Sequence, residues 1–418
     1  MRVLHLSHSD IAGGAARGAY GLHCALIGAG ISSRMMVRHK RTDDPSVFTP
    51  DDRLSKLIRY PLGKVPLLRL QHTDNPVYHS ANFLPSNWAA TINKCDADVI
   101  NIHWVGGETL SIEDIGRIRK PIVFTLRDMW PFSGAEHYSS DDGDARWRVG
   151  YSKANRGKNH RGLDIDRWVW MRKRNAWKVP MHIVCLSNWL GKCAQESALM
   201  RTWPITVIPN TINIDVFKPL NKLFSRQALN IPADKKVILF GAFGGAVDPR
   251  KGHDLLIEAL KYIQASDVKD DIECIVFGRR EPENPPCLPF KTRWMGHIND
   301  DVTLALLYNS ADVMVVPSLQ ESFGKTAAEP QACGCPVVAF GATGLTDVVE
   351  HCVTGYLAKA YSAEDLAKGI LWVISNNERG ATLSASARAH AVKLWAPEKV
   401  VSQYVEVYQN AVETRLSL

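Results

Sequence analysis

The sequence lacks the features that would mark a membrane-spanning or disulfide-rich secreted protein. No apolar run approaches the roughly 18 residues that a spanning helix needs. The chain opens on a strand-like segment, so we expect no secretory signal. Nine cysteines are scattered without a Cys-x-x-Cys pair, and Cys333 and Cys335 stand too close together for the usual zinc spacing. We therefore expect a reduced, cytoplasmic protein with free thiols.

Acidic residues are scarce in one segment, residues 146–178, which we call the basic block. It holds eleven Lys or Arg against two Asp, whereas the whole chain of 418 residues has a formal charge of +7. Tryptophans are interleaved with these charges, a pattern common at membrane interfaces and sugar-binding surfaces. A solvated charged face is the alternative. Nucleic-acid binding is disfavoured, because no recognised nucleic-acid-binding signature accompanies the charge. The side chains that we expect to dock an acceptor or a membrane are Trp147, Arg148, Trp168, Trp170 and Arg172.

Length and composition favour a globular protein of two domains. Apolar residues make up 45% of the chain and charged residues 22%, and 418 residues suffice for two separate cores. Polar, turn-forming residues 209–213 interrupt the alternation of strand-like and helix-like segments. We expect an N-terminal domain over residues 1–208, a linker over 209–225, a second domain over 226–396 and a C-terminal helix over 397–418 that packs back toward the first domain.

A strand, loop, helix and strand follow one another between residues 311 and 340. Apolar residues 313–316 predict a buried strand, and Gly324 opens a helix that ends near Cys333. The first amides of that helix, at Gly324, Lys325 and Thr326, suit an anion such as a diphosphate. Glu321 in the loop and Glu329 on the helix are placed to accept hydrogen bonds from sugar hydroxyls. Spacing alone leaves an ordinary strand–helix crossover equally open.

The same stretch resembles the Glu-x7-Glu signature of glycosyltransferase family 4, whose members retain the configuration of the transferred sugar. The matching residues are Glu321, Ser322, Phe323, Gly324, Glu329, residues 332–334 and 336–339, and downstream residues 341–344, 348–350 and 354–357. The resemblance implies that Glu321 orients the donor sugar, and that Ser322, Phe323 and the helix start bind the donor. Pro330 departs from the pattern, because proline disfavours helical geometry at Glu329.

Other donor-binding positions follow from the same resemblance. Lys251 matches a lysine that neutralises the leaving diphosphate, while Gly241 and Ala242 stand where the family has an arginine. Arg250 and Arg127 are therefore the substitutes that we expect. The Gly13–Gly14 pair resembles the family's diphosphate-facing loop, although tight strand-to-helix packing alone accounts for such a pair. Arg279 follows a strand where the nucleotide base rests in the family.

Two predicted strands of the first domain end in polar side chains. Residues 98–103 end in His103 and are followed by Trp104, and residues 121–126 are followed by Arg127 and Asp128. Ligands of open α/β sheets gather at the carboxyl ends of strands, so these are candidate ligand or catalytic residues, with packed polar residues as the alternative. Residues 125–134 with His137 and Tyr138 resemble a subgroup that acts in surface-polysaccharide assembly. Arg127 replaces a histidine of many members, and the cysteines of several are missing here.

Strand order and resemblance together predict the α/β GT-B arrangement, two Rossmann-like doubly wound domains facing across a cleft. We expect a metal-independent, retaining glycosyltransferase with a nucleoside diphosphate sugar as co-substrate and no other cofactor. The predicted acceptor is a saccharide or lipid-linked saccharide in bacterial exopolysaccharide, capsule or lipopolysaccharide assembly. A peripheral contact of the chain with the anionic cytoplasmic face of a membrane is the further partner that we consider. The alternatives are a GT-B sugar-nucleotide isomerase or hydrolase, and a non-catalytic sugar-nucleotide or anionic-lipid binding protein.

Overall fold

The computed structural model describes residues 1–50, 59, 61–65, 67, 71–241, 248–266 and 271–416. Two compact units make up the chain: unit 1 comprises Met1–Thr211 and Val400–Leu418, and unit 2 comprises Ile212–Lys399. Ala242 and most of the rest of the loop that precedes Arg250 lie outside the described residues. Among the helices that the structure describes, none is long and apolar enough to cross a membrane.

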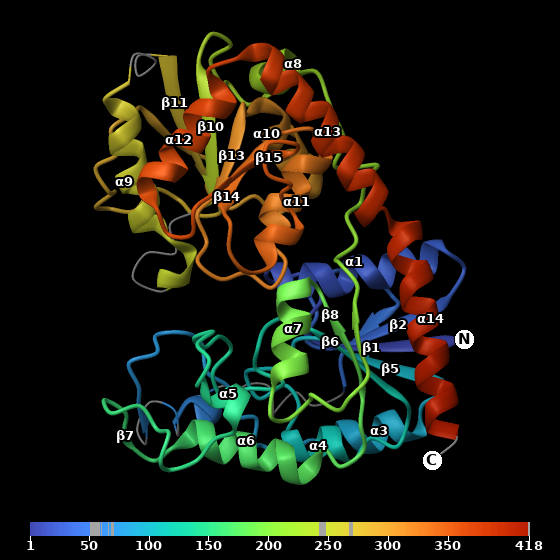
Figure 1. Cartoon of the computed structure of the whole chain (residues 1–418). Helices are drawn as coiled ribbons and strands as arrows, with labels where there is room; N and C mark the ends of the chain where they lie inside the picture. The colour runs from blue at the N-terminus through green and yellow to red at the C-terminus, as the bar shows by residue number, and fades with distance from the viewer. Residues whose placement is uncertain are drawn as a thin grey trace. The chain divides into compact units, whose positions relative to one another are not determined.

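Unit 1 is built around a parallel seven-stranded sheet in the order β3-β2-β1-β5-β6-β8-β9 (Figure 1). A separate antiparallel pair, β4 with β7, joins two loops. The elements of unit 1 are β1 (Arg2–Ser9), α1 (Gly14–Gly28), β2 (Ser32–His39), β3 (Val47–Phe48), β4 (Gln71–His72), α3 (Trp88–Lys94), β5 (Val99–Ile102), α4 (Ile112–Gly116), β6 (Ile122–Leu126), α5 (Arg146–Val149), β7 (Arg161–Gly162), α6 (Ile165–Ala176), β8 (His182–Cys185), α7 (Asn188–Glu196), β9 (Ile205–Val207) and most of α14 (Pro397–Leu416).

Unit 2 has a parallel six-stranded sheet in the order β12-β11-β10-β13-β14-β15. The buried strand predicted at residues 313–316 and the helix predicted to open at Gly324 are confirmed. The elements are α8 (Lys222–Ala228), β10 (Lys236–Gly241), η2 (Pro249–Lys251), α9 (His253–Gln264), β11 (Ile272–Phe277), β12 (Thr292–Trp294), α10 (Asp301–Ser310), β13 (Val313–Val316), α11 (Lys325–Ala332), β14 (Val337–Phe340), η4 (Thr343–Asp347), β15 (Gly355–Ala358), α12 (Ala363–Ile374) and α13 (Asn377–Trp395).

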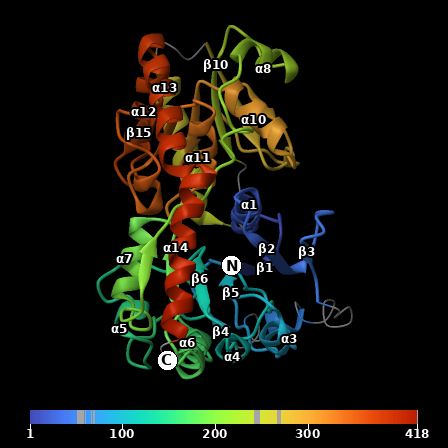
Figure 2. The ribbon, with the colours of Figure 1, turned by 90° about the vertical axis from the view of Figure 1, so that its right-hand side faces the viewer.

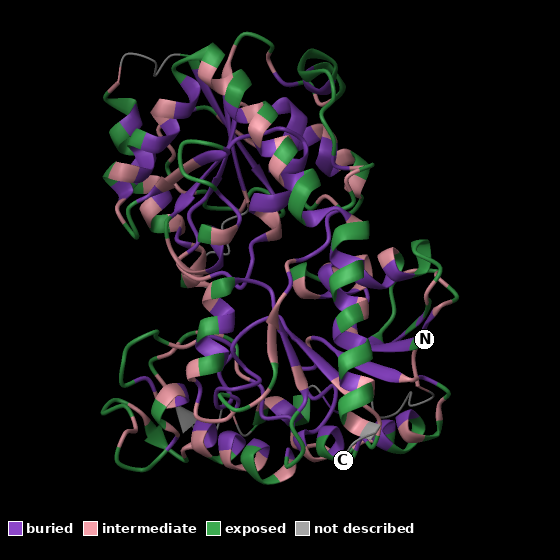
Figure 3. Cartoon of the chain, turned by 45° about the vertical axis from the view of Figure 1, so that its right-hand side comes forward, coloured by how far each residue is buried: buried purple, intermediate pink, exposed green. Residues whose placement is uncertain are grey.

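Both sheets are buried on their two faces, as expected for parallel strands covered by helices (Figure 3). In unit 1 successive strand residues alternate between two cores: Val3 packs with Leu22, Leu26 and α14, and Leu4 faces the core that contains α3, α4 and α6. In unit 2, α9 and α12 pack together over one core. Helix α14 runs along the unit 1 sheet (Figure 2), where Tyr408 accepts a hydrogen bond of 2.6 Å from Asn101 of β5.

Candidate functional site

The Glu321 loop lies at the carboxyl end of β13 and is fixed by backbone contacts. The amide of Glu321 donates to Thr343 Oγ1 at 3.0 Å, and its carbonyl oxygen accepts from the amide of Gly344 at 2.9 Å. A Cβ at Gly344 would lie 2.7 Å from that carbonyl oxygen, so only glycine allows this approach. Thr343 and Gly344 therefore position Glu321. The sequence marked these two residues only as part of the family resemblance and did not predict this role.

Two cations of unit 2 converge on the Glu321 carboxylate. Lys251 Nζ lies 2.5 Å and Arg250 Nη1 4.0 Å from Glu321 Oε1. Arg250 also donates to the carbonyl of Gln320 at 2.5 Å and pairs with Asp248 at 2.9 Å. Burial alone would raise the pKa of Glu321, but the positive charges of Lys251 and Arg250 outweigh it and hold the pKa below its ordinary value. Glu321 is therefore a carboxylate at neutral pH.

Gly252, just after Lys251, is in the left-handed region and packs against the chain that leads into the Glu321 loop. Its φ is +66°, and a Cβ there would lie 1.9 Å from the carbonyl oxygen of Pro317. The amide of Leu319 donates to the carbonyl of Arg250 at 2.7 Å. The backbone thus ties the two cations to the Glu321 loop independently of their side chains.

Helix α11 begins at Lys325, after Gly324 with φ +91°. The amides of Ala327 and Ala328 reach back to the carbonyl of Gly324, so the amides of Lys325 and Thr326 are the ones that helix geometry leaves for an anion. The helix continues through Pro330 to Ala332. Ser322 and Phe323 are buried before it, and the ring of Phe323 packs against Trp395 at 5.8 Å between centroids.

Glu329, the second glutamate of the motif, is 4% exposed and already has partners in unit 2. Lys325 Nζ lies 3.1 Å from Glu329 Oε1, and the hydroxyl of Tyr308 donates to Oε2 at 3.2 Å. The sequence analysis missed both partners, although Lys325 and Glu329 have the i, i+4 spacing that predicts such a pair. Gly241, at the end of β10, is half-buried. Arg279 is exposed and forms an isolated antiparallel bridge with Gly296.

In unit 1 the Gly13–Gly14 pair starts α1. Gly13 has φ +87°, which requires glycine, and a Cβ added at Gly13 or Gly14 would meet no described atom within 4 Å. Asp10 builds the preceding turn by accepting hydrogen bonds from the amides of Ile11, Arg41 and Thr42. The helix start is thus open to a ligand, and its predicted contact with the donor diphosphate stays a prediction.

Arg127 and His103 lie in a buried chain of hydrogen bonds. Arg127 donates to Asn210 Oδ1 through Nη1 and contacts His103 Nδ1 at 3.1 Å through Nη2, and His103 Nε2 lies 2.8 Å from His5 Nδ1. Because arginine only donates, His103 accepts at Nδ1 and donates from Nε2 to His5. Burial lowers the pKa of Arg127 to about 10 and that of His103 well below its ordinary value. Both side chains are hydrogen-bonded to other residues of the chain, and their predicted substrate contacts stay predictions.

Asp128 is likewise engaged within unit 1. Its Oδ2 accepts from Trp104 Nε1 at 2.8 Å and lies 2.6 Å from His137 Nδ1, while His137 Nε2 lies 2.8 Å from Ser80 Oγ. The amide of Gly107 also donates to Ser80 Oγ, at 3.0 Å. All three members of the Asp128–His137–Ser80 chain are at most 5% exposed. The geometry makes Asp128 a positioning residue for Trp104 and His137, and its predicted catalytic contact stays a prediction.

Two predicted docking residues of the basic block are wrong. Trp147 is fully buried and Trp170 is 5% exposed, since both belong to the main core of unit 1. Arg148 lies over the ring of Trp147 and is ion-paired with Asp141 and Glu196. Arg172 pairs with Glu113 at 2.5 Å and stacks on Trp168 at 4.5 Å. Trp168, at 42% exposed, is the predicted aromatic residue that reaches the surface.

Comparison with known protein families gives a match within unit 2. Residues 221–390, all within unit 2, match the family model described as "Glycosyl transferases group 1". A D-inositol 3-phosphate glycosyltransferase of Thermobispora bispora is 33% identical over 224 residues, which cover 50% of this chain and 51% of the relative. The chain spans about half the length of the curated relatives that it matches. The chain thus contains a glycosyltransferase group 1 domain, and the predicted class is confirmed at that level.

Solved structures extend the likeness to both units. The sucrose-phosphate synthase of Thermosynechococcus elongatus aligns with 99% of this chain and 100% of its own at 19% identity and a TM-score of 0.66. Anabaena HepE, solved with UDP and glucose, aligns with 98% of this chain and 99% of its own at 18% identity and a TM-score of 0.64. At this identity the likeness concerns the fold. The chain therefore has the predicted fold of two Rossmann-like α/β domains, which these solved structures share.

Proposed function

We propose that this chain is a retaining, metal-independent glycosyltransferase that moves a sugar from a nucleoside diphosphate sugar to a hydroxyl group. The observation that carries the proposal is the Glu321 carboxylate held 2.5 Å from Lys251 beside the start of α11, inside the glycosyltransferase group 1 domain. An anion site, two cations and a carboxylate stand together there. This is the set of groups that binding a diphosphate with a sugar attached requires.

In the proposed reaction the bond between the anomeric carbon and the β-phosphate oxygen breaks, and a bond from that carbon to the acceptor oxygen forms. The acceptor proton passes to the leaving phosphate oxygen. Lys251, Arg250 and the amides of Lys325 and Thr326 stabilise the negative charge on the diphosphate. Glu321 then accepts hydrogen bonds from the sugar, and Glu329 from the ribose. Two fixed cations would supply the charge compensation that other transferases obtain from a metal ion.

A saccharide or lipid-linked saccharide of surface-polysaccharide assembly is the acceptor that we propose first. Residues 125–138 support it through their resemblance to that subgroup, and Trp104 supports it from the structure. Trp104 lies at the carboxyl end of β5, is held by Asp128 and packs near Tyr78, which is 42% exposed. Half-exposed aromatic rings suit the apolar faces of sugars.

An inositol phosphate is the second candidate acceptor. The relatives that match half of this chain at 31–34% identity are named D-inositol 3-phosphate glycosyltransferases. The named acceptor belongs to those proteins, and it enters here as a substrate to assay beside lipid-linked oligosaccharides.

A thermal-shift screen with UDP, GDP, ADP, dTDP and CMP tests the donor site. A ligand at about 100 times its Kd stabilises the folded state by about 2.7 kcal/mol, so the correct nucleotide stands out. Lys251→Ala should abolish that shift. Lys261→Ala, which alters an exposed lysine of α9, is the matched control and should retain it.

Turnover assays separate the proposed transfer from its alternatives. Product formation that needs an acceptor and keeps the anomeric configuration supports the proposal. Consumption of the sugar nucleotide without any acceptor would indicate a hydrolase or isomerase. If none of the five nucleotides raised the unfolding midpoint, the assignment of the donor site would be wrong.

A further inference from the structure

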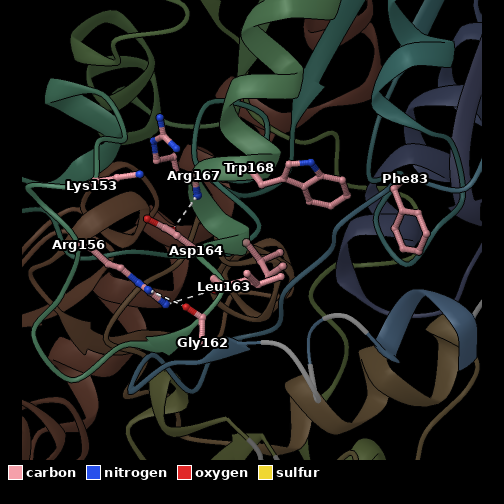
Figure 4. Close-up of a pocket in the computed structure, with 9 residues that line it drawn as sticks. Phe83, Lys153, Arg156, Gly162, Leu163, Asp164, Arg167 and Trp168 are labelled. Atoms are coloured by element: carbon pink, nitrogen blue, oxygen red, sulfur yellow. Dashed lines mark hydrogen bonds between the residues drawn. The ribbon is translucent and has the colours of Figure 1, made fainter.

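Unit 1 contains an open pocket of about 760 Å³ within the basic block, which we call the block pocket. Its volume is in the range of small-molecule sites. Figure 4 shows its cationic side chains on one side and the rings of Trp168 and Phe83 on the other. The residues that line the block pocket are Phe83, Lys153, Arg156, Gly162, Leu163, Asp164, Ile165, Arg167 and Trp168.

The apolar wall of the block pocket is open to solvent. Leu163 is 58% and Trp168 is 42% exposed, although the chain has ample core to bury them. The wall is nevertheless fixed. Arg156 donates to the carbonyls of Gly162 and Leu163 at 2.8 and 3.2 Å, and Asp164 caps α6 by accepting from the amide of Arg167. An exposed apolar surface held in a set shape indicates a ligand surface.

The charges around the block pocket select the kind of occupant. Lys153, Arg156 and Arg167 line it, and the lining acid, Asp164, is already paired with Arg146 at 2.6 Å. Fixed cations beside an apolar wall complement a molecule with a hydrocarbon part and an anionic head. A soluble phosphate would leave the apolar wall uncovered, and a free oligosaccharide would stack on the ring of Trp168 but leave the aliphatic side chain of Leu163 uncovered.

We propose that the block pocket takes the hydrocarbon of an anionic phospholipid, with the phosphate at the side of Lys153 and Arg167. The chain thereby docks on the surface of an anionic membrane. The membrane-docking inference rests on the proposed function in one respect: a lipid-linked acceptor would be located at a membrane surface. The residues of the block pocket belong to unit 1, whereas Lys251 and Glu321 belong to unit 2.

Co-sedimentation of the full chain with vesicles tests the site. We expect binding to vesicles of equal parts phosphatidylcholine and phosphatidylglycerol, and much less to phosphatidylcholine alone. Leu163→Ser should weaken binding about tenfold, the effect of losing one buried aliphatic side chain. Val149→Ser is the matched control, since Val149 is 59% exposed in the same block and does not line the pocket. It should bind as the unaltered chain does.

The charged side of the block pocket has its own pair of variants. Lys153→Gln should weaken binding at low salt, and Lys178→Gln, an exposed lysine of the block outside the pocket, should not. The inference is overturned by equal binding to both vesicle types, by Leu163→Ser binding like Val149→Ser, or by Leu163→Ser raising the KM of a soluble saccharide instead. The nucleotide shift should survive in Leu163→Ser. Vesicle binding without any nucleotide shift would refute the proposed function and leave this site standing.

Discussion

The two units place different chemistry at the same point of the same topology. In unit 2 the order β12-β11-β10-β13-β14-β15 reverses direction between β10 and β13, and in unit 1 the order reverses between β1 and β5. Ligands of such sheets bind outside the strand ends at that reversal. Unit 2 has the charged Glu321–Lys251 pair there, whereas unit 1 has His103 and Trp104 in hydrogen-bonded networks. The shared fold therefore fixes where a site forms, and the loops decide what it does.

Burial disfavours the charged form at both sites, but the neighbouring charges differ. Glu321 keeps its charge because two cations offset the cost of burial, whereas burial keeps His5 and His103 neutral by lowering their pKa. Unit 1 thus gains rigidity from neutral polar contacts. Unit 2 keeps charged groups whose partners a ligand can replace. Substitutions should accordingly affect stability in unit 1 and activity in unit 2.

Trp147→Ala should have the largest effect on stability, a loss of about 3–5 kcal/mol in unit 1, because it removes a fully buried indole. Trp168→Ala, at a 42% exposed position of the same block, should cost less than about 1 kcal/mol. Urea unfolding followed by tryptophan fluorescence compares them, since most of the 12 tryptophans lie in unit 1. Equal losses would contradict the burial that separates these two residues.

Glu321→Gln should reduce kcat/KM for sugar transfer about 100-fold, equivalent to about 2.7 kcal/mol, because it removes the carboxylate that pairs with Lys251 and that we propose orients the sugar. Its side chain is buried, but glutamine has the same size and its amide oxygen can still accept a hydrogen bond from Lys251, so the unfolding midpoint should change little. Glu281→Gln, at an exposed position of the same unit, is the control and should keep full activity. An active Glu321→Gln enzyme, or one that fails to fold, would remove the contrast between the units.

Acid should destabilise unit 1 more than unit 2. A histidine whose folded pKa is depressed adds stability that is fully present above its unfolded pKa, near 6.5, and is lost as the pH falls through the folded pKa. For His8, with a pKa lowered to about 4 by burial first and by neighbouring positive groups second, the loss by about pH 5 is at most about 2 kcal/mol. Burial lowers further pKa values in unit 1, those of His5, His23, His79, His103 and His182.

Urea unfolding at about pH 7 and about pH 5 measures the acid effect. The fluorescence transition, dominated by unit 1, should move to lower urea at pH 5. The nucleotide shift of unit 2 should persist, since Glu321 stays ionised above its depressed pKa. If lowering the pH abolished the nucleotide shift but left the fluorescence transition unchanged, unit 2 would be the more acid-sensitive unit and the prediction would be wrong.

The sequence predicts the strands well and the partners of polar side chains poorly. Runs such as residues 313–316 are bounded by turn residues, so their period and length identify a buried strand. In α6 the helical period separates Trp168 from Trp170, but the sequence does not say which of the two faces the core. The link between Ser80 and His137 joins loops 57 residues apart, and no local pattern encodes it. Contacts that depend on loop conformation are therefore the part that requires coordinates.

Tyr408→Phe should have a small effect on stability, about 1–2 kcal/mol in unit 1. The hydroxyl of Tyr408 accepts from Asn101 Nδ2 at 2.6 Å, and removing it leaves a buried amide without that acceptor. Tyr262→Phe, at a 49% exposed tyrosine of unit 2, should have no measurable effect. Hydrogen exchange of β5 and β6 locates the change: faster exchange there in Tyr408→Phe shows that α14 stabilises the unit 1 sheet. If exchange increased in the strands of unit 2 instead, α14 would belong energetically to the glycosyltransferase group 1 domain, and the division of the chain into these two units would be wrong.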